Sequence, residues 1–246
     1  MSSNIAIPTT AGIHVGTTLD LVRRLAMESG TVTHPTTSIT TIVNATGETA
    51  RLASWIINAW RDIQNLKPNW KFMRRSCTFV TVAGQYNYTP VQCGITLNTF
   101  GRWDLNSFRS YLTSGGTNGE MFMSKLDYDY YRDSYLYGAN RAVRAQPLYV
   151  TEFPDTTLGL GPIPPVGYTI KGDYYAAPKD LADDAEVPAL PTQCNLMIIV
   201  WAALKNYGYF DAAPEAIERA KEEYQKLLYQ LMRDQLPPVR MGGPLR

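Results

Sequence analysis

The chain has 246 residues and 45% of them are hydrophobic, which is enough to bury one core or two smaller ones. Its 23 lysine and arginine residues nearly balance 22 aspartate and glutamate residues, and the formal net charge of +1 argues against tight binding of nucleic acid over a broad face. Three scattered cysteines, with no Cys-x-x-Cys or Cys/His pattern, argue against a disulfide framework or a zinc site and favour folding in the cytoplasm.

Neither a targeting segment nor a membrane-spanning segment is expected. The first residues, MSSNIAIPTTAGIHVG, lack the charged and apolar regions of a signal peptide. The longest apolar run, at residues 196–204, is about half as long as a bilayer demands. We therefore expect no membrane partner.

Residues 1–45 are rich in Thr, Ser, Gly and Pro and predict an N-terminal arm with a short helix. In this helix Leu19, Val22 and Leu25 share one face, and Gly30 ends the pattern. Residues 36–47 alternate β-branched side chains, so they fit either a strand or a loop.

A longer helix is predicted at residues 46–66. Thr46 can cap it, and Glu48 in the first turn suits the positive end of the helix dipole. Apolar residues recur at three- and four-residue steps, and Trp55 and Trp60 flank them as expected packing anchors.

Residues 72–177 change to a β pattern. Short strands are predicted on both sides of Ala83-Gly84, and again at 147–153, 157–160 and 167–175, where the short connections predict antiparallel hairpins. Turn residues recur through 94–119 and end in a predicted loop at 114–119. Residues 120–137 are ambiguous, because Leu126, Tyr130 and Tyr131 fit one face of a helix that Tyr135 would extend.

Two further helices follow an acidic segment that is broken by prolines. The first, at 191–207, is apolar nearly all round and should lie at the centre of a helical lobe, with Gly208 as its cap. The second has Pro214 in its first turn and an apolar stripe that ends near residue 235. The helix at 46–66 can cover the other side of the central helix. The last residues, QLPPVRMGGPLR, have no periodicity and predict an extended tail.

These elements predict an α+β fold with a helical bundle lobe that is discontinuous in sequence. Residues 46–71 and 190–236 would form this lobe, and residues 72–189 would form an inserted antiparallel β-sheet or sandwich lobe. Residues 1–45 would precede them as the arm, and residues 237–246 would follow as the C-terminal tail.

The sequence contains no catalytic constellation. Its two histidines, His14 and His34, lie in the predicted arm, and no GxGxxG, GKS/T or GxSxG pattern is present. An acidic cluster at 127, 129 and 133 could hold a divalent ion or simply form a solvated face, and a second cluster at 180–186 fits a charged solvent loop. We therefore predict no catalytic, cofactor-binding or metal-binding residue and no enzyme activity.

Tyrosine is abundant, at 16 residues, and many of these lie in the β region. Most fit ordinary sheet positions, but a protein–protein interface would also use them, because tyrosine offers a large amphipathic contact at a low cost in side-chain entropy. A third reading is a stacking surface for sugars or for single-stranded nucleic acid, which Arg132, Arg141 and Arg144 beside Tyr135 and Tyr137 would suit.

Three stretches in a fixed order carry a family resemblance. The first is the helix ASWIINAWRDIQNL with the WKFMRR segment and the strand behind it. The second is LGLGPIPPVGYTIKGDYYAAPKDL. The third is a gate at Pro188 and Pro191 before the apolar and amphipathic helices. Over residues 46–235 this order resembles the head-to-tail adaptor, or connector and head-completion, proteins of tailed bacteriophages.

The resemblance implies a structural, non-enzymatic protein of the virion neck. Such adaptors form a homo-oligomeric ring, commonly dodecameric, beneath the portal protein. The ring extends the channel through which genomic DNA passes without sequence-specific binding, and it receives a downstream neck or tail protein such as a tail tube, nozzle or tail terminator. The helical lobe would build the ring, and the C-terminal segment would dock on the portal. Carried over to this chain, the docking residues are Leu236, Pro237, Pro238, Val239, Arg240, Met241, Leu245 and Arg246.

Two other functions are compatible with the same residues. Another neck or tail component with a receptor- or glycan-binding β module would use the tyrosine-rich region as its working surface. A hydrolase would need the cluster of Asp127, Asp129 and Asp133 to hold a metal ion.

Overall fold

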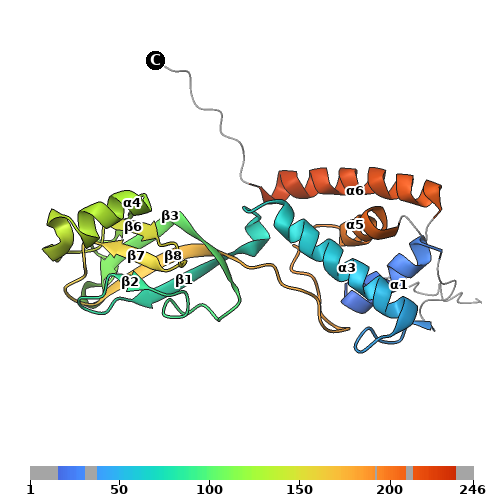
Figure 1. Ribbon diagram of the computed structural model, residues 1–246, viewed down its shortest axis with the longest axis horizontal. Helices are drawn as coiled ribbons and strands as arrows, with labels where there is room; N and C mark the ends of the chain where they lie inside the picture. Colours follow the sequence, from blue (N-terminus) through green and yellow to red (C-terminus); the bar gives the residue numbers. More distant parts are fainter. Residues whose placement is uncertain (1–15, 31–37, 192, 209–212, 237–246) are drawn as a thin grey trace, which may run out of the picture. The chain divides into compact units, whose positions relative to one another are not determined.

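The computed structural model describes residues 16–30, 38–191, 193–208 and 213–236 and confirms an α+β fold. The chain divides into a helical unit, formed by Met1–Phe72 with Lys179–Arg246, and a sheet unit, formed by Met73–Pro178 (Figure 1). The helices of the helical unit are α1 (Thr18–Glu28), α3 (Gly47–Leu66), α5 (Met197–Tyr207) and α6 (Pro214–Gln235). None of the helices in the described ranges is both long enough and apolar enough to cross a membrane.

Helix α5 is the centre of the helical unit, as its apolar sequence predicted. Every residue from Ile198 to Leu204 is buried, and α1, α3 and α6 all pack against the helix (Figure 1). The helix begins later than expected, at Met197, because the Asn195 side chain accepts a hydrogen bond from the Met197 N–H at 2.9 Å and fixes the first turn there. Gly208 is the C-cap residue, as predicted, although its backbone is right-handed rather than left-handed.

Two tryptophans anchor α3 and the segment behind it. Trp60 is 2% exposed and Trp70 is fully buried, and both rings stack on Phe72 with centroids 6.0 and 5.6 Å away. The indole N–H of Trp70 donates to the Ile63 carbonyl at 2.9 Å, so the chain that leaves α3 is tied back to its last turn. The expected packing role is confirmed for Trp60, whereas Trp55 is only half-buried beneath the Arg51 guanidinium.

The acidic segment before α5 is more than the solvated loop that the sequence predicted. The Thr18 N–H donates to the Glu186 carbonyl at 2.8 Å, and the Leu19 N–H donates to the Asp184 carbonyl at 3.2 Å, so this segment satisfies the free donors at the start of α1. The Asp184 carboxylate also accepts from the Thr41 hydroxyl and the Ile42 N–H, each at 2.7 Å. The described residues 39–46 therefore contain a turn at 43–44 and no strand, and this carboxylate holds the segment in place.

Asp184 is expected to make the stability of the helical unit sensitive to acid. The hydrogen bonds from the Ile42 N–H and the Thr41 hydroxyl hold the pKa of Asp184 below its ordinary value. A carboxylate of this kind stabilises the fold above its unfolded-state pKa, and that contribution is lost as the pH falls through the folded-state pKa. The Asp184→Asn variant should have a lower urea midpoint at neutral pH, and it should lose less stability than the wild type between about pH 5 and about pH 2.

A matched control is Asp183→Asn, which removes an exposed neighbouring carboxylate. This variant should keep the acid sensitivity of the wild type. If Asp184→Asn loses as much stability in acid as the wild type does, the hydrogen bonds of Asp184 do not carry the effect.

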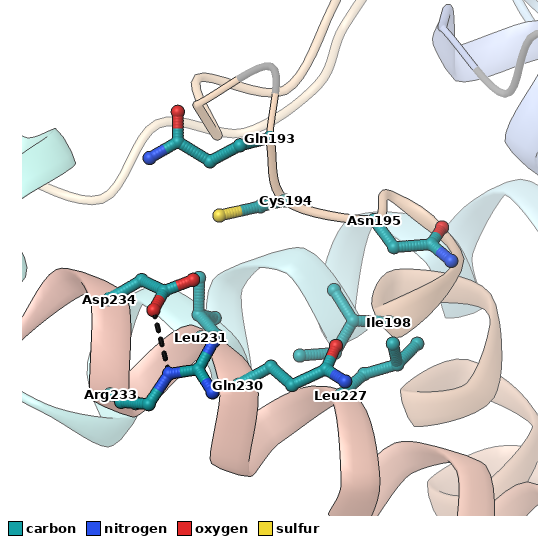
Figure 2. A pocket seen from close by; sticks show the side chains of 9 residues that line it. All are labelled: Gln193, Cys194, Asn195, Ile198, Leu227, Gln230, Leu231, Arg233 and Asp234. Carbon is teal, nitrogen blue, oxygen red and sulfur yellow. Dashed lines mark hydrogen bonds and ion pairs between the residues drawn. The ribbon is translucent and has the colours of Figure 1, made fainter.

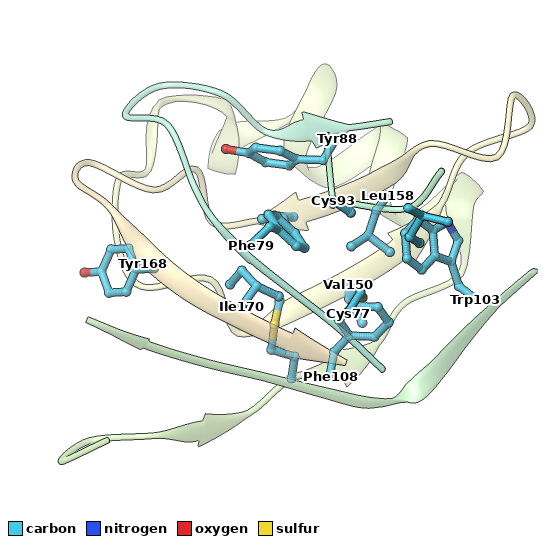
Figure 3. Packing of buried hydrophobic residues seen from close by; sticks show 13 residues of the cluster. Cys77, Phe79, Tyr88, Cys93, Trp103, Phe108, Val150, Leu158, Tyr168 and Ile170 are labelled. Atoms are coloured by element: carbon cyan, nitrogen blue, oxygen red, sulfur yellow. The ribbon is translucent and has the colours of Figure 1, made fainter. Parts of the chain in front are cut away.

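The sheet unit is a sandwich of two sheets. Its strands are β1 (Arg74–Val80), β2 (Asn87–Tyr88), β3 (Phe100–Leu112), β4 (Met121–Phe122), β5 (Ser124–Lys125), β6 (Tyr149–Glu152), β7 (Leu158–Gly161) and β8 (Tyr168–Ala176). The sheet orders are β1-β8-β3-β4 and β2-β7-β6-β5, with antiparallel pairs except for parallel β5 and β6. A cluster of buried apolar side chains from strands of both sheets forms the core (Figure 3).

Turns lie at both ends of residues 94–119 and the loop predicted at 114–119 is confirmed, but strand β3 fills residues 100–112 between them, which the sequence did not predict. Trp103 and Phe108 are an odd number of residues apart, so strict alternation would place them on opposite faces. A register shift between Asp104 and Arg109 bends the strand instead, and both rings enter the same core (Figure 3). The Ser107 hydroxyl bridges the irregular stretch, since it accepts from the Asp173 N–H at 2.8 Å. The sequence pattern of a strand is hidden by this bulge.

The hairpin prediction was right for one pair and wrong for the next. Strands β6 and β7 pair antiparallel, with Val150 opposite Leu160. Strand β8 lies in the other sheet, between β1 and β3, so β7 and β8 do not form a hairpin. The ambiguous stretch is helical at α4 (Tyr128–Tyr131) and in a π-helical turn at Arg132–Leu136.

Candidate functional site

The predicted docking segment lies almost wholly outside the described residues. Only Leu236 is described, and the other predicted docking residues, Pro237, Pro238, Val239, Arg240, Met241, Leu245 and Arg246, are not. Leu236 is the C-cap of α6, with an extended backbone at φ −92° and ψ 150°, and its N–H donates to the Met232 carbonyl at 3.0 Å. The chain thus leaves the helix in an extended direction at Leu236.

A hollow of about 290 Å³ lies beside this helix end. Its apolar floor consists of Ile198 from α5 and Leu227 and Leu231 from α6 (Figure 2). Polar side chains surround the floor, namely Gln193, Cys194, Asn195, Gln230, Arg233 and Asp234. Their positions follow from the packing of α5 on α6, which brings the segment before α5 over the last turns of α6.

The charges at the hollow are locally balanced. The Arg233 guanidinium donates to the Asp234 carboxylate at 3.0 Å (Figure 2). The Lys71 ammonium donates to the Asp234 carbonyl at 3.3 Å. Burial, with the nearby Asp234 charge, raises the pKa of the Cys194 thiol, so the thiol is neutral and a poor nucleophile at neutral pH. The arrangement suits an apolar side chain and a few amide hydrogen bonds from a partner, and it has no activated nucleophile or base.

This hollow was missed by the sequence reasoning, and only the proline gate in front of it gave a signal. Gln193, Asn195 and Gln230 are ordinary polar residues in sequence, and they become neighbours only through the packing of two helices. The candidate residues that the sequence did identify begin at Leu236 and continue beyond the described residues.

The carboxylates of Asp127, Asp129 and Asp133, which a hydrolase would need for a metal ion, instead form contacts within their own helical segment. Asp129 and Asp133 each lie 3.0 Å from the Arg132 guanidinium, and Asp127 accepts from the Asp129 N–H at the start of α4. Within the described part of the chain, no group of three or more Asp, Glu, His or Cys side chains could hold a metal ion. His14 and His34 lie outside the described residues.

Comparison with known proteins gives one result that covers nearly the whole chain. The model of the family described as SU10 adaptor protein matches residues 17–246, which includes both units and every described helix and strand. No curated protein matches the chain. The chain belongs to the SU10 adaptor protein family and is a bacteriophage adaptor-type protein.

Proposed function

We propose that this chain is a head-to-tail adaptor that assembles as a ring, commonly dodecameric, beneath the portal protein at one vertex of the capsid. The ring extends the DNA channel and joins the capsid to a downstream neck or tail protein such as a tail tube, nozzle or tail terminator. The observation that carries this proposal is the family match over residues 17–246. The adaptor family is a structural one, and the protein acts in the virion.

The helical unit has the form that a ring subunit needs. Its central helix α5 is enclosed by α1, α3 and α6, so the unit keeps its own core while its outer helix faces stay free for neighbours. On those faces Tyr229 of α6 is 70% exposed and Leu66 of α3 is 42% exposed. We assign these residues to contacts between subunits, where tyrosine is favoured.

The charge of the chain suits a channel for DNA. A formal net charge of +1 gives no broad basic field, and a strongly basic lumen would hold a polyanion instead of letting it slide. The DNA contact would therefore be passive and independent of sequence.

The portal contact is proposed for residues 236–246. Val239, Met241 and Leu245 would supply apolar anchors, and Arg240 and Arg246 would supply charge contacts. One such segment binds weakly, but a ring presents many copies at a high effective concentration, so the avidity of the ring is much greater. The segment starts where α6 ends, so its removal leaves every described helix intact.

Deletion of residues 237–246 is expected to abolish attachment to the portal without unfolding the protein. The truncated and full-length proteins should have the same circular dichroism spectrum and urea midpoint, and only the full-length protein should co-sediment with purified portal. A chain of equal length with residues 237–246 in scrambled order is the matched control, and it should also fail to bind. Undiminished binding by the truncated protein would refute the docking assignment.

A further inference from the structure

A second hollow, in the sheet unit, has a composition unlike the first. Its volume is about 410 Å³, and it is lined by Tyr86, Tyr135, Tyr137, Arg141 and Arg144 around Ile163. The sequence places Arg132, Arg141 and Arg144 near Tyr135 and Tyr137, and the structure brings all of these except Arg132 to the lining of this hollow. It adds Tyr86, which comes from the segment before β2 and is distant in sequence.

Packing fixes one tyrosine side chain of this second hollow, which we call the groove. The Tyr135 ring is 8% exposed and stacks on Tyr131 with a centroid distance of 5.3 Å, and the Tyr131 hydroxyl donates to the Leu160 carbonyl at 2.8 Å. A Cβ atom at Gly161 would lie 3.2 Å from the Tyr135 ring. The glycine therefore lets the helical segment at 128–136 lie close to β7. Tyr137, in contrast, is 76% exposed at the rim. The side chain of Tyr135 is therefore held in place by packing, whereas the side chain of Tyr137 is accessible to a partner.

The two arginines of the groove carry charge that the described part of the chain does not neutralise. Arg144 donates to the Arg141 carbonyl at 3.2 Å, and its backbone bridges to Ile163, but neither guanidinium forms an ion pair with a described carboxylate. Arg132 differs, because Asp129 and Asp133 both pair with it. Arg141 and Arg144 are exposed, so they are available to an anion from outside.

We propose that this groove binds a short acidic peptide segment of a partner protein, with an aromatic or aliphatic side chain next to its carboxylates. The arginines would take the carboxylates in paired, charge-assisted hydrogen bonds. The apolar side chain would pack on the tyrosines and Ile163, and tyrosine and arginine are the residue types that carry most binding energy in protein interfaces. The inference rests on the proposed function only in identifying the partner as the downstream neck or tail protein.

The charges nearby favour a peptide over a nucleic acid. Asp127, Asp129 and Asp133 lie on the same helical segment as Tyr135, and Asp129 and Asp133 keep 73% and 67% of their side chains exposed. A single strand of nucleic acid prefers a surface that is positive along its length, and this segment carries three carboxylates against the one guanidinium of Arg132. A peptide needs only one or two anions placed at the arginines.

The test selects ligands for the full-length protein from a random dodecapeptide library and then measures the selected peptide by isothermal titration calorimetry. We expect selected sequences with acidic residues beside an aromatic or aliphatic one. The double variant Arg141→Glu/Arg144→Glu should bind the selected peptide at least about tenfold more weakly. Tyr137→Ala should also weaken binding, and since this ring is 76% exposed, its loss should leave the fold intact.

Arg132→Gln is the matched control. Arg132 lies on the same helical turn as Tyr135, but its side chain does not line the groove. It should bind the selected peptide as tightly as the wild type. Selection of sequences without acidic residues, or equal binding by the double variant, would overturn the proposal. Binding of an oligodeoxythymidylate that the double variant loses would assign the groove to nucleic acid instead. The double variant should still attach to the portal, which separates this proposal from the portal assignment.

Discussion

Replacement of Trp70 by alanine is expected to destabilise the helical unit by about 3–5 kcal/mol, because it removes a fully buried indole. The cavity would open beside Phe72, whose ring stacks on Trp70 at 5.6 Å, and the Ile63 carbonyl would lose its hydrogen-bond donor. Urea unfolding followed by far-ultraviolet circular dichroism measures the effect, since most of the helix lies in this unit.

Trp55→Ala is the control for this change, because it removes the same side chain from a half-buried position under Arg51. Its cost should be about 1–2 kcal/mol, since less surface is lost and the neighbours can relax. If the two substitutions destabilise the protein equally, Trp70 is not the anchor that joins the end of α3 to the following chain.

The second large effect is expected in the sheet unit, for Phe108→Ala. Phe108 is fully buried at the bulge of β3, and a Cβ atom at Gly172 of β8 would lie only 2.4 Å from its ring, so the ring fills the space over that glycine. Its loss should cost about 3–5 kcal/mol. Hydrogen exchange measured by mass spectrometry should show faster exchange in β1, β3 and β8.

The control is Phe122→Ala, because Phe122 on β4 is 54% exposed. This change should cost about 1 kcal/mol or less and should leave exchange in β1 and β8 as it is in the wild type. In both variants the amides of α5 should keep their protection, since α5 is in the core of the other unit. Faster exchange of α5 in Phe108→Ala would contradict the division into two separate cores.

The sequence predicted the helices well because their signals are local. The apolar run of α5 and the spacing of the apolar residues of α3 each depend on residues within a few turns, and Pro214 marks the start of α6. Strand β3 was not predicted, because the features that make it a strand are not local in sequence. The bulge after Asp104 breaks the alternation, and only pairing with β8 makes the segment a strand. The acidic segment was also misread, since nothing near Asp184 in sequence reveals that Thr41 and Ile42 hydrogen-bond to its carboxylate.

The candidate sites also differ in whether local sequence could predict them. The docking segment beyond Leu236 came from the family resemblance and the lack of periodicity, and it stays a prediction. The hollow between α5 and α6 is built from polar residues without any pattern, so only the fold could bring them together. The groove with Arg141 and Arg144 could be predicted in part, because its arginines and two of its tyrosines are close in sequence, whereas Tyr86 is far from them in sequence.

We propose that the chain builds a ring on the portal. Electron microscopy of the full-length protein mixed with its purified cognate portal tests this function most directly. We predict portal particles that carry an additional ring at their narrow end, with an open channel continuous with that of the portal. Portal particles that stay bare at a saturating concentration of folded protein would contradict the adaptor function.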